Sequence, residues 1–142
     1  MLRPARLVYL GSSMHFGARP ARPGSLWQDG RWRGRVDYSQ TKFMDVALAL
    51  AVARLWPEVR SNAVDPGWVP TRMGGAHAPD DLQEGAMTQY LLALGEAGLD
   101  ETTGQYLRRR RVVEPDPAVR EHIWQDEFLA LCAAITGVRL PS

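Results

Sequence analysis

Short apolar runs alternate with longer helical patterns along this chain, and this order constrains its fold more than any other feature. Residues 7–10 (LVYL) form a β-rich run that stops at a Gly-Ser-Ser turn, and residues 59–64 (VRSNAV) stop at Asp-Pro-Gly. Between them, apolar residues recur at spacings of three and four from residue 38 to residue 56. Short strands joined through a helix predict a parallel sheet with right-handed crossovers.

The second half of the chain continues the same alternation. A helix is expected over residues 80–94, because acidic residues occupy its first turn and glycines follow its last. Residues 104–107 (GQYL) predict a third strand, whose exit extends through four arginines to residue 113. A final helix is expected from residue 116 to residue 136, with a proline near its first position. The prediction is therefore one α/β domain with three strands and flanking helices.

Composition excludes several classes of protein. The 142 residues have a net charge of +1, which gives no reason to expect a nucleic-acid partner. Two features could still indicate nucleic-acid binding: the loop 14–37 contains Trp27 and Trp32 among basic residues, and residues 108–111 are all arginine. A solvated strand end or an anion contact explains the arginine run better than nucleic-acid binding does. No apolar run approaches the roughly 18 residues that span a membrane. Cys132 is the only cysteine, and no Cys/His cluster has metal-ligand spacing, so we expect a cytoplasmic protein without a metal site.

The segment 38–42 (YSQTK) holds the only lysine among 17 basic side chains. Tyr38 and Lys42 are four residues apart, so on a helix they share one face. A tyrosine is a poor base near neutrality, but a nearby ammonium stabilises the phenolate, and lysine offers a more compact cation than arginine. Alone, this pattern also fits a surface tyrosine and a surface lysine. Its place beside the carboxyl ends of two predicted strands, where α/β sheets bind ligands, favours a proton-transfer site.

Three motifs in order, RLVYLGSS, YSQTK and NAVDPGWVPT, resemble the second half of a short-chain dehydrogenase/reductase. A G-x-Y strand and a terminal helix follow, as in that family, and the long gap between serine and tyrosine resembles the retinol-dehydrogenase-like and ketoreductase-like branches. The resemblance implies the C-terminal half of a doubly wound, Rossmann-like fold. It also implies an NAD(P)(H) cofactor and a small-molecule alcohol or carbonyl as substrate.

The resemblance carries roles to individual residues. Tyr38 would be the general acid/base that protonates the substrate carbonyl oxygen, and Lys42 would bind the nicotinamide ribose hydroxyls and favour the phenolate. Ser12 would hydrogen-bond the carbonyl oxygen, with Ser13 as the alternative.

Four further residues are implied at the cofactor. The backbone at Pro66 and Gly67 would approach the nicotinamide, the Val69 main chain would meet the carboxamide, and Thr71 would lie beside the cofactor. The loop 69–86 would form part of the substrate pocket, for which the candidate lining residues are Trp68, Met73 and His77.

The glycine-rich turn of that family, G-x-x-x-G-x-G, does not occur before residue 7. We therefore expect the cofactor-binding N-terminal half to be absent from this chain, which would be a fragment, a mis-started reading frame or one part of a split enzyme. The first strand should then have an unpaired edge, and helix 38–56 should expose an Ala/Val/Leu face. The alternative to an oxidoreductase is a non-catalytic remnant that acts as an interaction module and forms a homodimer through helix 38–56.

Overall fold

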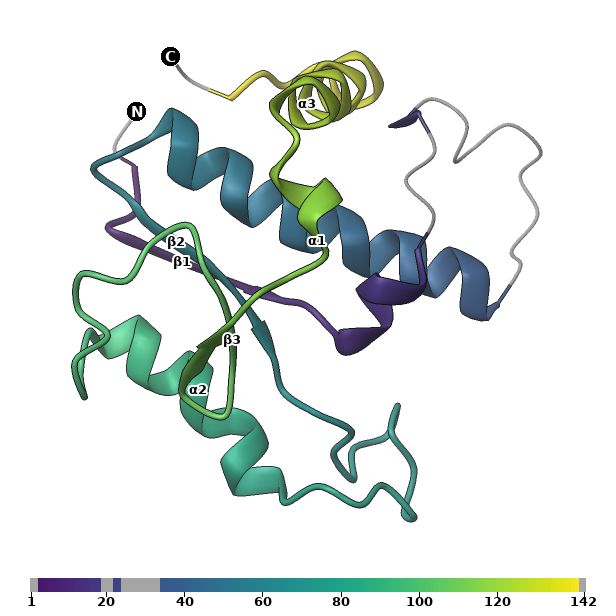
Figure 1. Cartoon of the computed structure of the whole chain (residues 1–142), viewed down its shortest axis with the longest axis vertical. Helices are drawn as coiled ribbons and strands as arrows, with labels where there is room; N and C mark the ends of the chain where they lie inside the picture. The colour runs from purple at the N-terminus through teal and green to yellow at the C-terminus, as the bar shows by residue number, and fades with distance from the viewer. Residues whose placement is uncertain (1–2, 19–21, 24–33, 141–142) are drawn as a thin grey trace.

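The computed structural model describes residues 3–18, 22–23 and 34–140. One sheet has the strand order β1-β2-β3-β4 (Figure 1). Its strands are β1 (Arg6–Leu10), β2 (Arg60–Asp65), β3 (Tyr106–Arg108) and β4 (Arg111–Val113). The first three strands are parallel and β4 is antiparallel to β3. The predicted α/β class and the parallel pairing of the first three strands are confirmed.

The third predicted strand is in fact a hairpin. Strands β3 and β4 are joined by Arg109 and Arg110, whose φ angles are 47° and 63°. Positive φ at both central residues is what a type I′ turn requires, and such turns usually contain Asn-Gly. The prediction of three strands is therefore wrong, because two arginines in a left-handed conformation give no turn signal in the sequence.

Within the described residues, three α-helices flank the sheet, together with two short 3₁₀ helices. They are α1 (Arg35–Leu55), α2 (Leu82–Leu94), α3 (His122–Thr136), η1 (Ser13–Gly17) and η3 (Pro117–Arg120). Helices α1 and α3 lie on one side of the sheet and α2 lies on the other (Figure 1).

All three helix starts differ from the prediction, and α2 begins at Leu82 instead of residue 80. Helix α1 begins three residues before Tyr38, so Asp37 lies in its first turn, and Gly34 occupies the cap position. The predicted last helix begins as η3, where the Asp116 side chain accepts a hydrogen bond from the Ala118 amide. In the predicted loop 14–37, η1 forms at the start, whereas Trp27 and Trp32 lie outside the described residues.

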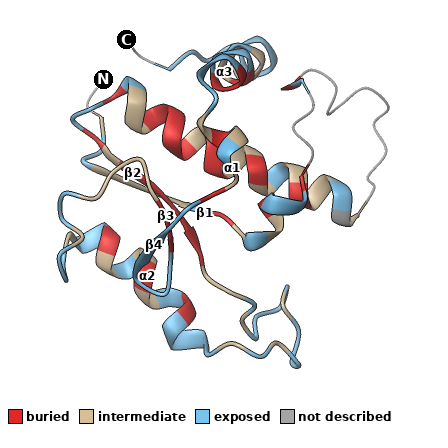
Figure 2. Cartoon of the chain, viewed as in Figure 1, coloured by how far each residue is buried: buried red, intermediate tan, exposed pale blue. Residues whose placement is uncertain are grey.

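Helix α1 is the centre of the core (Figure 2). Its apolar residues pack against η1, β1, β2, η3 and α3, and Val46, Ala47, Ala49 and Ala51 are 0% exposed. The expectation that this helix exposes an Ala/Val/Leu face is therefore wrong for the described chain, since α3 and the two 3₁₀ helices cover that face. A homodimer through helix 38–56 stays a prediction.

Strand β1 lies at one end of the sheet and, among the described residues, pairs with β2 alone. The Arg60 amide donates to the Ala5 carbonyl (2.9 Å) and the Gly11 amide donates to the Val64 carbonyl (2.7 Å). Alternation along the strand therefore turns the backbone groups of Val8 and Leu10 outward. Across the described ranges, no helix combines the length and apolarity needed to cross a membrane.

Candidate functional site

The carboxyl ends of β1, β2 and β3 meet at one edge of the sheet, and most of the predicted site residues lie there. Tyr38 and Lys42 occupy the beginning of α1, which packs on η1 immediately after β1. Ser12 precedes η1, and Pro66 follows β2. The fold thus brings the ends of distant segments to one place, as the strand order predicted.

Lys42 links α1 to the end of β1. Its ammonium donates to the Leu10 carbonyl (2.9 Å) and to Asp45 Oδ2 (3.0 Å). The same nitrogen lies 5.8 Å from the centroid of the Tyr38 ring. The cation therefore lies near both the tyrosine ring and the end of the strand that leads into Ser12, and its role in proton transfer stays a prediction.

The two serines after β1 have different partners. Ser12 Oγ accepts a hydrogen bond from the Met14 amide (3.2 Å) and caps η1, which leaves the hydroxyl hydrogen able to donate to a ligand. The Ser13 side chain is exposed, and its amide donates to Asp65 Oδ2 (3.2 Å). The Ser13 contact uses its backbone amide and not its hydroxyl, so the choice between the hydroxyls of Ser12 and Ser13 stays a prediction.

The predicted cofactor residues lie on the loop that follows β2. Gly67 has a φ of +82°, a conformation that favours glycine. The Thr71 amide donates to the Val69 carbonyl (2.8 Å), so these two residues form a tight turn. Asp80 joins the two ends of the loop, because its Oδ2 accepts from the Trp68 amide (2.7 Å) and its own amide donates to the Trp68 carbonyl (3.0 Å).

The arginine run after β3 contacts acidic side chains of this loop and of α2. Arg109 pairs with Asp80 (2.9 Å) and Arg110 pairs with Glu84 (2.9 Å). The Arg110 amide also donates to Thr88 Oγ1 (2.9 Å). These contacts fix the hairpin against the loop.

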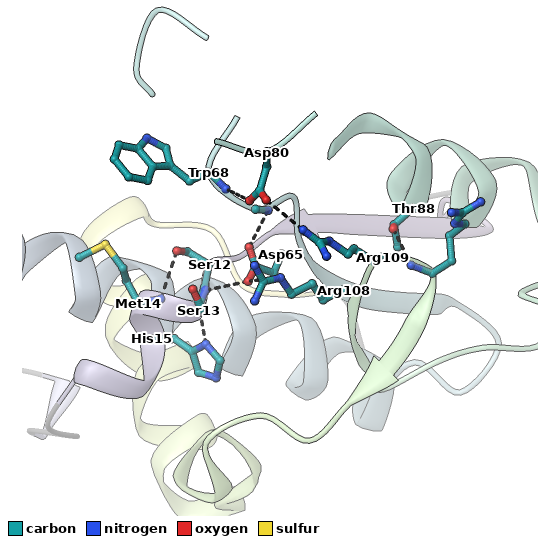
Figure 3. A network of polar contacts seen from close by, with 12 residues as sticks. Ser12, Ser13, Met14, His15, Asp65, Trp68, Asp80, Thr88, Arg108 and Arg109 are labelled. Atoms are coloured by element: carbon teal, nitrogen blue, oxygen red, sulfur yellow. Dashed lines mark hydrogen bonds and ion pairs between the residues drawn. The ribbon is translucent and has the colours of Figure 1, made fainter. Parts of the chain in front are cut away.

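Asp65, which the sequence marked only as a turn residue, is buried at the centre of this edge (Figure 3). Its Oδ1 accepts from the Gly67 amide (2.8 Å) and its Oδ2 accepts from the Ser13 amide (3.2 Å). Arg108 Nε lies 3.7 Å from Oδ2. One carboxylate therefore contacts all three strand ends.

His15 is completely buried beneath the serine turn. Its Nδ1 lies 2.7 Å from the Ser12 carbonyl oxygen, and its Nε2 accepts from the Asp116 amide (3.0 Å). These partners require a neutral ring with the hydrogen on Nδ1. Burial lowers the pKa of His15, although the Ser12 carbonyl and the nearby Asp116 and Asp65 oppose that shift.

Tyr106 packs edge-on against the His15 ring, with 4.8 Å between the ring centroids. Its hydroxyl is buried without a hydrogen-bond partner among the described residues. Burial, and then the charge of Asp65, raises the pKa of Tyr106. Tyr106 therefore stays a neutral phenol beside the carboxylate.

Two hollows open at this edge. One of about 190 Å³ lies between the β2 loop, α2 and the hairpin. The other, of about 470 Å³, is lined by Ser13, Met14, Gly17, Val36 and Ser39. Trp68, Met73 and His77, which were predicted to line a pocket, are exposed and line neither hollow.

Curated proteins resemble the chain along nearly its whole length. A short-chain dehydrogenase of Penicillium rubens is 29% identical over 143 residues, which covers 99% of this chain and 55% of that protein. An uncharacterized oxidoreductase of Emericella nidulans is 30% identical over 139 residues, which covers 96% of this chain and 52% of that protein. The chain thus matches proteins named as short-chain dehydrogenases along nearly its whole length, in agreement with the resemblance of its motifs. It spans about half the length of these curated relatives, and no protein-family model matches it.

Two more similar proteins differ in what they support. An NADPH carbonyl reductase of Sus scrofa is 37% identical over 83 residues, which covers 54% of the chain and 29% of that protein. The crystal structure of an uncharacterized protein from Mycobacterium paratuberculosis superposes with a TM-score of 0.71 at 18% identity. The match covers 96% of this chain and 52% of that protein. At that identity the structural match supports the fold alone.

Sequence reasoning missed Asp65 and His15 as parts of this candidate site. Asp65 directly precedes Pro-Gly, so it was taken for an ordinary turn former. His15 follows the serine turn by two residues, but its second partner, Asp116, is 101 positions away. Only the closeness of both residues to the ends of predicted strands offered a signal.

Proposed function

We propose that this chain carries the proton-transfer residues of an NAD(P)-dependent oxidoreductase that interconverts an alcohol and a carbonyl. The observation that carries the proposal is the position of the Lys42 ammonium, between the Tyr38 ring and the Leu10 carbonyl. Ser12 lies two residues beyond Leu10, and α1 packs on η1 directly after Ser12, which supports a shared site for the acid/base, the cation and the hydroxyl donor. The family names of the relatives support the same reaction class.

Each residue has a defined task in carbonyl reduction. When bound, a reduced nicotinamide would supply the hydride for the carbonyl carbon. The Tyr38 hydroxyl donates its proton to the carbonyl oxygen, and the Ser12 hydroxyl holds that oxygen by a hydrogen bond. Lys42 stabilises the phenolate that remains on Tyr38.

The chain offers groups that suit a nicotinamide ribose. An ammonium has three N–H donors, and Leu10 and Asp45 use two of those of Lys42, which leaves one for a ribose hydroxyl. At Gly67 the Asp80 carboxylate fills the space that a side chain would take, so the approach of a nicotinamide to this backbone stays a prediction. The module that dimerises through helix 38–56 has less support, because α1 buries its apolar residues within the chain.

The substitution Tyr38→Phe tests this function. NADPH, and then NADH, is titrated into the purified chain by following nicotinamide fluorescence, and turnover is measured with a panel of small aldehydes and ketones. We expect Tyr38→Phe to bind cofactor within about 2-fold of the parent and to lose turnover by roughly 10²–10⁴-fold, the usual contribution of a positioned acid/base.

Tyr90→Phe is the matched control, because Tyr90 is an exposed tyrosine on α2 and lies outside the site. Turnover that survives in Tyr38→Phe would remove Tyr38 from the acid/base role. A chain that binds neither cofactor at millimolar concentration would refute catalysis by this chain.

A further inference from the structure

We infer that Asp65 is a positioning residue, whose carboxylate holds the Ser12–Ser13 turn and the Pro66–Gly67 turn in one fixed relation. We call this arrangement the Asp65 clamp. The effect of the clamp on the reaction rests on the proposed function, since Ser12 would contact the substrate and Gly67 would contact the cofactor. The clamp itself is a property of the fold, and it can be measured without any turnover.

The two oxygens of Asp65 serve different turns. Oδ1 accepts from the Gly67 amide at 2.8 Å, within its own loop, and Oδ2 accepts from the Ser13 amide at 3.2 Å, across to the next strand end. Figure 3 shows both contacts converging on the one side chain. Because Asp65 is only 4% exposed, water cannot readily replace either amide.

Only a carboxylate fits both amides at once. An ionised Asp accepts hydrogen bonds at both oxygens, whereas Asn presents one oxygen and one NH₂ donor. In Asp65→Asn, the NH₂ group would therefore face the N–H of Ser13 or of Gly67, and one of the two turns would lose its acceptor. The Arg108 guanidinium, 3.7 Å away at Nε, offsets the charge that this arrangement buries.

The serine turn has a second, independent support. His15 Nδ1 lies 2.7 Å from the Ser12 carbonyl oxygen, while Asp65 accepts a hydrogen bond from the amide of Ser13. The peptide group between Ser12 and Ser13 is thus fixed at both its carbonyl and its amide. These contacts orient the backbone that carries the Ser12 hydroxyl. Positioning by such neighbours affects rate because small misplacements of reacting groups are costly.

The first test is amide hydrogen exchange of the whole chain, followed by NMR. In Asp65→Asn we expect exchange of the Ser13 amide, the Gly67 amide or both to accelerate by at least 10-fold. The Gly11 amide, which donates to the Val64 carbonyl, is the internal reference and should change by less than 2-fold. Asp126→Asn, on the exposed face of α3, is the matched control and should leave all three amides unchanged.

A second pair of variants removes the Ser13 donor without touching the carboxylate. Ser13→Pro deletes the amide hydrogen, and Ser12 already has the extended backbone (φ −165°, ψ 149°) that proline favours in the preceding residue. Ser13→Ala keeps the amide and is the control. If the chain turns over substrate, we expect kcat of Ser13→Pro to be at least 10-fold below that of Ser13→Ala, with KM for the cofactor within 3-fold.

The outcomes separate the clamp from the proposed function. If Asp65→Asn leaves the Ser13 and Gly67 amides as protected as in the parent, the clamp is wrong. If the clamp breaks but kcat of both Asp65→Asn and Ser13→Pro is unchanged, Asp65 does not position the site. If the parent chain itself shows no turnover, the proposed function fails, and amide exchange alone then decides whether the clamp exists. If Asp65→Asn does not fold, amide exchange in the two Ser13 variants decides whether the clamp exists. The clamp predicts that the Gly67 amide exchanges faster in Ser13→Pro than in Ser13→Ala, while the Gly11 amide is the same in both.

Discussion

At the scale of single residues, His15 is a neutral ring locked between the Ser12 carbonyl and the Asp116 amide. Protonation of Nε2 would remove the acceptor that the Asp116 amide needs, and burial already opposes the charge. The ring therefore links the serine turn to the start of η3 through these two contacts, in addition to packing in the core. No pattern in the sequence connects these two segments.

This environment predicts a pH dependence of stability. Since burial lowers the pKa of His15 in the folded chain, the unfolded chain takes up the proton first on acidification. The free energy of unfolding should therefore be highest above pH 6.5 and fall as the pH drops below it, by up to about 1.4 kcal/mol per pH unit from this residue. Urea unfolding between pH 7.5 and pH 5 measures the slope.

His15→Gln should be less stable than the parent at pH 7.5 and should have a smaller slope below pH 6.5. His122→Gln, at an exposed histidine of α3, is the control and should keep the slope of the parent. Equal slopes for His15→Gln and the parent would show that another group causes the pH dependence.

At the scale of elements, α2 and the loop after β2 approach closely at Gly85. A Cβ added at Gly85 would overlap Val69 Cγ1 and lie 3.0 Å from the Pro66 carbonyl oxygen. Gly85 is buried within α2, where glycine is otherwise unfavourable by about 1 kcal/mol relative to alanine. Packing against the loop is therefore the reason for a glycine here.

Gly85→Ala should destabilise the chain by about 1–3 kcal/mol, because the steric cost exceeds the gain in helix propensity. Val69→Ala removes the clashing methyl group, so the double variant should recover part of that loss. Denaturant unfolding of the two single variants and the double variant measures the coupling. An alanine at Gly85 that stabilises the chain would mean that the loop moves aside at no cost.

The elements also show what a sequence can predict. The runs at 7–10 and 59–64 were found because β-rich apolar residues end at clear turn signals. The β3–β4 hairpin was missed because Arg109 and Arg110 are unusual at positive φ, and their contacts with Asp80 and Glu84 are long-range. Asp65 was missed as a clamp for the same reason: its partners come from two different turns. Local pattern predicts elements, whereas the contacts between their ends depend on the assembled sheet.

At the scale of the whole molecule, β1 has no strand on its outward side among the described residues, although its Leu10 carbonyl accepts from Lys42. The backbone groups of Val8 and Leu10 face away from β2, and an unpaired edge invites pairing with another strand. We therefore expect the chain to associate as its concentration rises, through this edge rather than through the covered face of α1.

Val8→Pro tests the edge. It removes an outward amide without deleting a β1–β2 hydrogen bond, and proline is tolerated on edge strands. Sedimentation equilibrium over a range of concentrations should show a rising average mass for the parent and for Val8→Ala, and a lower mass for Val8→Pro. Identical curves for Val8→Pro and Val8→Ala would exclude the β1 edge as the contact.

The bond between Lys42 and the Leu10 carbonyl has a consequence for how such experiments are read. A strand that pairs along β1 to its end would use that carbonyl as an acceptor and compete with Lys42 for its lone pairs. Self-association would then weaken the contact of the ammonium and change its affinity for any anion or hydroxyl that it binds. By thermodynamic linkage, a ligand of Lys42 must shift the self-association equilibrium by the same factor. Protein concentration is therefore a variable of every ligand titration on this chain, and apparent affinities should be compared only at matched concentration.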